Sequence, residues 1–142
     1  MADTTSPYWR AEVMVQVDMV NAWIVFAEGD VGGGLRLAAA AADHEDEVDK
    51  HPVTPGEVLP ARELYADMLF ESGNHAKSLE QYRSVLRGSP NRLNALLGAA
   101  RAAAKAGDSR RAEEYYAQAR EQTASGDRRR QGLEQAWAAS RQ

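Results

Sequence analysis

The chain has 142 residues, 27% of them charged, and a formal net charge of −4. This length suits one domain with a continuous core. There is no cysteine, which excludes disulfides and thiolate zinc sites and leads us to expect a cytoplasmic protein. The most apolar window, residues 13–27, contains Gln16, Asp18 and Asn21 and falls short of the roughly 20 apolar residues that a membrane span needs. We therefore expect no membrane partner.

The first two predicted elements are helices. Ser6-Pro7 predicts a helix start, because serine caps free backbone amides and proline is tolerated at the first helical position. Gly29-Asp30 predicts the end of this helix. Three consecutive glycines, residues 32–34, carry high conformational entropy and predict a poor helix start. We therefore expect the second helix to begin at Leu35 and to continue through an alanine-rich run into acidic residues.

Prolines interrupt the pattern between Lys50 and Pro60, where the backbone is restricted to extended and turn conformations. Glycine and proline stop signals then separate further helices. These predicted helices cover residues 61–72, 75–87, 92–106 and 109–123, and a last one follows Asp127. No segment alternates apolar and polar residues over the length of a strand. The sequence therefore predicts an all-α fold.

Several residues recur at an interval of 34 positions. The pairs are Ala66 and Ala100, Gly73 and Gly107, Ser78 and Ala112, and Tyr82 and Tyr116. Such an interval, with a glycine turn between two helical patterns, is typical of a helical repeat. At these residues the chain resembles the tetratricopeptide repeat (TPR) family. In that family each repeat is a helix pair, with small residues where the helices touch and an aromatic residue in the gap to the next pair.

The resemblance implies a TPR-like right-handed superhelix of antiparallel helix pairs, with about three pairs and a C-terminal capping helix. The implied parts are a degenerate repeat at 15–48, a Pro-rich insertion at 49–60, repeats at 59–92 and 93–126, and a capping helix at 127–142. Leu133, Ala136 and Trp137 share one face of the last helix, as a capping helix requires. The segment around residues 45–63 also resembles a part of bacterial TPR proteins, which implies no activity.

The resemblance further implies a concave groove, lined by the first helix of each pair, that binds a protein or peptide. Carried over by position, the groove residues are Met19, Trp23 and Phe26, then Glu63, Asp67, Phe70 and Glu71, then Leu97, Arg101 and Lys105. The open alternative is that these acids and bases pair with one another and contribute little. Chaperone-tail receptors of this family grip a terminal carboxylate with polar and basic residues. This chain has Met19, Trp23, Asn94 and Gly98 at those positions, so we expect no such ligand.

The first helix is apolar nearly all round. Its apolar residues are Val13, Met14, Val15, Val17, Met19, Val20, Trp23, Ile24, Val25 and Phe26. A helix of this kind is buried on more than one side. We therefore predict a homodimer built mainly from the N-terminal helix. The alternative is that the second helix or a folded-back C-terminal helix covers it.

The resemblance implies a non-catalytic interaction scaffold or adaptor, and we expect no cofactor. The acidic run from Asp43, followed by His51, contains metal-ligand types, but one acidic helix end rarely makes ligands converge around an open position. We expect no metal there. The alternative is an enzyme or metal-binding subunit that uses the acidic His44–His51 region. Arg128-Arg129-Arg130 is a small basic patch in an acidic protein, so we expect no nucleic acid partner.

Overall fold

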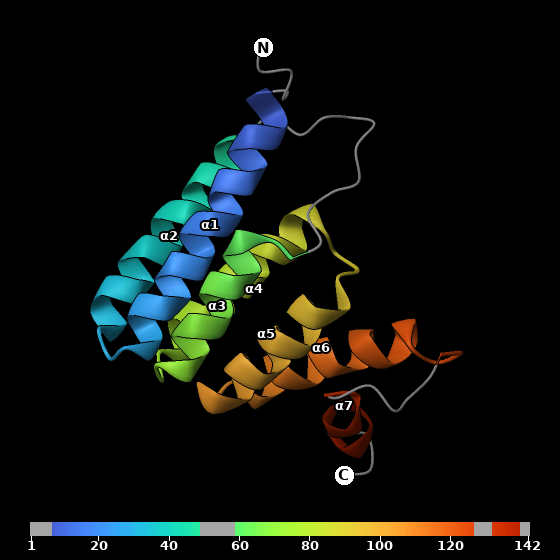
Figure 1. The fold of residues 1–142 in the computed structure, drawn as a ribbon. Coiled ribbons are helices and arrows are strands. Elements are labelled where there is room, and N and C mark those ends of the chain that lie inside the picture. The colour runs from blue at the N-terminus through green and yellow to red at the C-terminus, as the bar shows by residue number, and fades with distance from the viewer. Residues whose placement is uncertain (1–6, 49–58, 127–131, 140–142) are drawn as a thin grey trace. The chain divides into compact units, whose positions relative to one another are not determined.

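The structure is a computed structural model that describes residues 7–48, 59–126 and 132–139. Within these ranges every regular element is an α-helix and there is no strand, as the sequence predicts (Figure 1). The helices are α1 (Pro7–Ala27), α2 (Val31–Glu47), α3 (Ala61–Glu71), α4 (His75–Gly88), α5 (Leu93–Lys105), α6 (Ser109–Gln122) and α7 (Leu133–Ala139). None of the described helices is long and apolar enough to cross a membrane.

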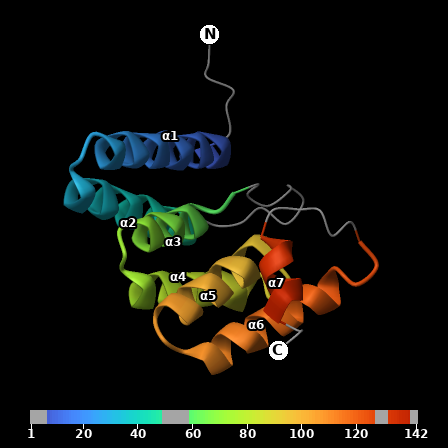
Figure 2. The same cartoon turned by 90° about the horizontal axis from the view of Figure 1, so that it is seen from below.

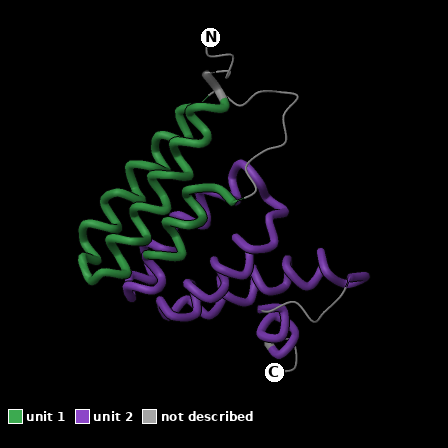
Figure 3. The backbone as a smooth tube through the Cα atoms, in the orientation of Figure 1, with its two compact units in different colours: residues 1–68 green, residues 69–142 purple. Residues whose placement is uncertain are grey.

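The chain divides into two compact units, Met1–Met68 and Leu69–Gln142, which Figure 3 colours separately. We call them unit 1 and unit 2. Unit 1 contains α1, α2 and most of α3, and unit 2 contains the end of α3 and α4 to α7. The proline-rich insertion predicted at 49–60 lies largely outside the described residues.

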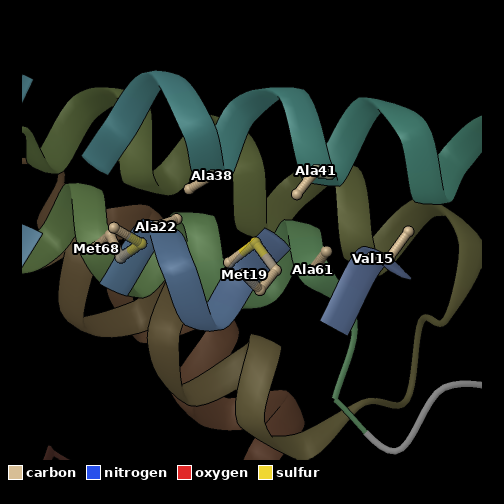
Figure 4. Packing of buried hydrophobic residues seen from close by; sticks show 8 residues of the cluster. Val15, Met19, Ala22, Ala38, Ala41, Ala61 and Met68 are labelled. Atoms are coloured by element: carbon tan, nitrogen blue, oxygen red, sulfur yellow. The ribbon is translucent and has the colours of Figure 1, made fainter. Parts of the chain in front are cut away.

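The core of unit 1 is formed by small and medium apolar side chains. α1 and α2 lie side by side in both cartoon views (Figure 1 and Figure 2). Met19 and Ala22 of α1 lie close to Ala38 of α2, and Ala61 and Met68 of α3 join the same cluster (Figure 4). Alanine at these positions allows the helices to approach closely, which is how protein interiors reach their high packing density.

The second helix begins earlier than the sequence predicts, at Val31 rather than at Leu35. The Asp30 carboxylate accepts a hydrogen bond of 2.8 Å from the backbone N–H of Gly33 and so caps the glycine-rich start. A Cβ on Gly34 would lie 2.8 Å from a backbone carbonyl oxygen of α1. Glycine is therefore needed where the two helices meet, and tertiary packing overrides its weak helix propensity.

Three helix ends share one turn geometry. Gly29, Gly73 and Gly107 have positive φ angles of 104°, 81° and 86°, which glycine adopts at little cost. The residue after each glycine donates its backbone N–H to a carbonyl five residues earlier: Asp30 to Val25 (3.2 Å), Asn74 to Leu69 (2.9 Å) and Asp108 to Ala103 (2.9 Å). The turn between α1 and α2 thus has the same hydrogen bonds as the two turns that lie 34 residues apart.

The core of unit 2 runs through α4 to α7. Leu96 and Leu97 of α5 pack with Ala119 of α6 and with Leu133 and Ala136 of α7. The Arg120 guanidinium donates hydrogen bonds to the Ala136 carbonyl oxygen (2.7 Å) and to a Glu113 carboxylate oxygen (2.6 Å), and so links α6 to the end of α7. The apolar face expected of the capping helix is therefore buried. Asp127 and Arg128–Arg130, expected at its start, lie outside the described residues.

Candidate protein-interaction surfaces

One face of α1 is both apolar and exposed. Of the large apolar side chains that are exposed among the described residues, six lie on α1 and are 44–59% exposed, whereas Val31 and Leu37 lie on α2. The six are Trp9, Val13, Met14, Val17, Val20 and Ile24. All but Met14 form one stripe along the helix at about 100° per residue, and we call these five the outward stripe. α1 therefore has two apolar faces, and α2 covers the other one.

The groove positions expected in unit 1 are only partly accessible. Met19 is 1% exposed and belongs to the core, because its side chain packs against α2. Glu63 is 2% exposed. These two residues therefore cannot line an accessible groove, which corrects the sequence-based expectation. Trp23 and Phe26 are half-buried and stack edge to face, with ring centroids 5.6 Å apart. Asp67 is also half-buried.

The groove positions expected in unit 2 form an aromatic and basic surface. The Arg101 guanidinium lies over the Phe70 ring, 5.4 Å from its centroid. The His75 imidazole also packs on the Phe70 ring, and the two ring centroids are 4.9 Å apart. Glu71 and Lys105 are exposed. We call Phe70, His75, Arg101 and Lys105 the aromatic–basic patch.

Leu97 is the groove position in unit 2 that the structure does not leave accessible. It is 5% exposed and belongs to the core with Leu133 of the capping helix. The patch also contains His75, which packs on Phe70. His75 is the first residue of α4, directly after the turn at Gly73. This position in the sequence indicates that His75 lies near the end of α3.

Tyr116 lies within electrostatic range of Arg101. Burial raises the pKa of the Tyr116 hydroxyl above its usual value, the positive charge of Arg101 lowers this pKa, and the negative charge of Glu113 raises it. Its hydroxyl lies 3.5 Å from the Gln135 side-chain oxygen of α7. Arg101 therefore interacts with the Phe70 ring of α3 and, through its charge, with the half-buried Tyr116 of α6.

The acidic end of α2 holds the start of α3. Glu45 is 3% exposed, and its carboxylate accepts a hydrogen bond of 2.7 Å from the backbone N–H of Ala61. Arg62 forms ion pairs of 2.7 Å with both Asp43 and Asp46. Burial opposes the charge on Arg62, but its hydrogen bonds to both aspartates, together with their charges, raise the pKa of the guanidinium.

These contacts bear on the alternative of a metal or active site at residues 44–51. Three of the acidic residues bind the start of α3: Asp43 and Asp46 pair with Arg62, and Glu45 accepts from the Ala61 N–H. In the described part of the chain no three histidine, aspartate or glutamate side chains are grouped as metal ligands, and His51 lies outside that part. Glu45 is buried, and its hydrogen-bond partner lies 16 residues away along the chain.

Comparison with known proteins identifies the family of the chain. The model of the tetratricopeptide repeat family matches residues 69–138, which contain α4 to α6 and all but the last residue of α7. Residues 69–138 of this chain are tetratricopeptide repeats. No curated protein matches it. Tetratricopeptide repeats generally mediate protein–protein interaction and are typically non-catalytic.

As a TPR protein, the chain lacks room for a carboxylate clamp at Gly98. A Cβ on Gly98 would lie 2.3 Å from Cζ of Tyr82, so no basic side chain fits there. Met19, which holds another position of that clamp, is buried in the core of unit 1. The expectation that this TPR protein does not bind chaperone tails therefore has a steric reason at both positions.

Proposed function

We propose that this TPR protein is a non-catalytic assembly module that associates with a second copy of itself through α1 and binds a protein or peptide partner. In this proposal α1 and α2 are a diverged repeat that precedes the two better repeats. The shared hydrogen bonds at Gly29, Gly73 and Gly107 support this reading of α1 and α2. We propose that the protein is located in the cytoplasm.

The main support for self-association is the exposed outward stripe of α1. Five large apolar side chains in one row, each 44–59% exposed, are unusual on a helix whose opposite face is already buried. Contiguous exposed apolar patches mark sites of association. The apolar side chains Leu133 and Ala136 of the C-terminal helix are buried with Leu97 in the core of unit 2.

The aromatic–basic patch is the proposed site for the partner peptide. Phe70 offers an apolar anchor, Arg101 offers positive charge beside it, and Lys105 lies one helical turn further along α5. Aromatic residues and arginine are the side chains in which interface energy concentrates. We expect the bound segment to place an apolar side chain on Phe70 and an acidic side chain on Arg101. Trp23 and Phe26 are the corresponding candidates in unit 1.

Two measurements test the proposal. Light scattering at tens of micromolar should give a molar mass about twice the 15.5 kDa of one chain, and a monomer mass would reject self-association.

Labelled nonapeptides that combine acidic and aromatic residues should bind to the aromatic–basic patch, and Arg101→Ala should weaken their binding about tenfold. Arg83→Ala, at an exposed position of α4, should leave the binding unchanged. Equal loss in both variants, or no binding by any peptide of the set, would reject the proposed patch.

A further inference from the structure

The outward stripe of α1 has a spacing that fits a copy of itself in the reverse direction. Val13, Val17, Val20 and Ile24 follow one another at intervals of four, three and four residues, which reads the same from either end. Apolar residues that alternate at three and four residues form the contact line between two helices of a coiled coil, which we call the seam. An interface between identical chains related by a two-fold axis requires a self-complementary surface of this kind.

We propose that two copies pair through α1 in an antiparallel arrangement, with Val13 opposite Ile24 of the second copy and Val17 opposite Val20 of the second copy. This inference rests on the proposed self-association and adds its direction and register. The two-fold axis then crosses the seam between positions 18 and 19. The pairing buries four apolar layers from each copy, and at each end Trp9 and Arg10 lie opposite Glu28 and Ala27 of the second copy.

Charges beside the stripe distinguish the antiparallel pairing from a parallel one. Arg10 and Glu28 are both exposed and lie 18 residues apart, which is about five helical turns or roughly 27 Å. They therefore flank the stripe on the same side, at opposite ends. The Glu28 N–H donates to the Ile24 carbonyl oxygen (2.9 Å), so Glu28 continues the helical path. In the antiparallel register Arg10 of each copy lies within one residue of the position opposite Glu28 of the other, so their side chains can pair, whereas a parallel pairing keeps them a full helix length apart.

The size of the patch is sufficient for a dimer of modest stability. The five side chains of the outward stripe, each about half exposed, offer on the order of 450 Å², within the range of the largest patches on monomers. Pairing two such surfaces buries on the order of 1,000 Å² in total, which is near the lower limit of specific interfaces. The ion pairs at the two ends then set the direction more than the affinity.

Disulfide trapping tests the register directly, because the chain has no cysteine of its own. Two single variants, Val13→Cys and Ile24→Cys, are prepared separately and oxidised alone or as an equimolar mixture. The proposal predicts a covalent dimer that contains one chain of each variant and that forms in the mixture. A parallel dimer would instead trap each variant with itself. Self-trapped dimers in excess of the mixed one, or no trapped dimer in any sample, would overturn the proposal.

A charge exchange tests the ends of the seam. Arg10→Glu and Glu28→Arg should each weaken self-association about threefold or more, because each places like charges opposite one another in both copies. The double variant should return to within about twofold of the original chain. Failure of the double variant to recover would overturn the antiparallel register. If the double variant does not recover but the unmodified chain is a dimer, only the antiparallel register is rejected. If the unmodified chain is a monomer, both self-association and the register are rejected.

Discussion

Gly98 of α5 and Tyr82 of α4 are in direct contact at the centre of unit 2. Tyr82 is 1% exposed, and a Cβ added to Gly98 would lie 2.3 Å from Cζ of its ring. Contacts between carbon atoms that are not bonded to one another are favourable only at about 3.5–4.0 Å. The aromatic residue of one repeat thus occupies space that the next repeat leaves empty by using glycine.

This contact predicts that Gly98→Ala destabilises the protein. Alanine normally favours a helix by about 1 kcal/mol over glycine, but overpacking of a closed core costs about 1–3 kcal/mol. We therefore expect a lower free energy of unfolding, measured by urea denaturation. Gly88→Ala is the matched control, since a Cβ at this helical glycine meets nothing within 4 Å. It should raise stability by about 0.4–1 kcal/mol. Equal effects of the two changes would contradict the contact.

Tyr82→Ala should lower the free energy of unfolding by about 3–5 kcal/mol, because it empties a buried site that the surrounding helices cannot refill. Thermal denaturation followed by circular dichroism measures this loss. Leu37→Ala removes a large apolar side chain that is 45% exposed and should cost much less. An unchanged melting curve for Tyr82→Ala would refute the packing of the repeats.

Glu45→Ala should destabilise the protein by about 1–3 kcal/mol, because it leaves the buried backbone N–H of Ala61 without its acceptor. Glu47→Ala, at an exposed position on the same helix, should change stability by no more than about 0.5 kcal/mol. Chemical denaturation of both variants checks the difference. Equal effects would show that the acidic end of α2 does not hold the start of α3.

Stability should fall at alkaline pH because two tyrosines are harder to ionise in the folded protein. Burial raises the pKa of Tyr65 and of Tyr116 above the ordinary value of 10.0. The unfolded chain therefore loses these protons first, so the stabilisation is complete below pH 10.0 and is lost as the pH rises through the folded pKa. The variants Tyr65→Phe and Tyr116→Phe should each show a shallower decline in urea-derived stability between about pH 9 and 11. An unchanged slope in both would contradict their burial.

Local signals in the sequence predicted most helix boundaries. Pro7, Gly29, Gly73 and Gly107 mark ends that depend on backbone conformation alone, and the structure places ends within one or two residues of them. The prediction that the glycines before Leu35 lie outside the second helix was wrong. Glycine is needed at position 34 because the backbone of α1 lies so close to it. A residue's own propensity contains no information about such a neighbour.

The candidate site was less predictable than the fold, for a related reason. The repeat register identifies which residues share a helix face, and Phe70 and Arg101 are indeed in contact. It does not say whether a neighbouring helix covers that face, and Met19 and Leu97 are buried by α2 and α7 respectively. The cap that Glu45 provides depends on a contact 16 residues away, which no local pattern records.

The central claim is that copies of this protein meet at the outward stripe of α1, and Val17→Asp tests it most directly. Val17 is 44% exposed, so a carboxylate there should leave the fold intact but disrupt a paired apolar seam. Sedimentation equilibrium at tens of micromolar should show a dimer for the unmodified chain and for the control Ala104→Asp, an exposed position on α5. Val17→Asp should sediment as a monomer with an unchanged circular dichroism spectrum. A monomer for the unmodified chain, or a dimer that Val17→Asp leaves intact, would contradict the account.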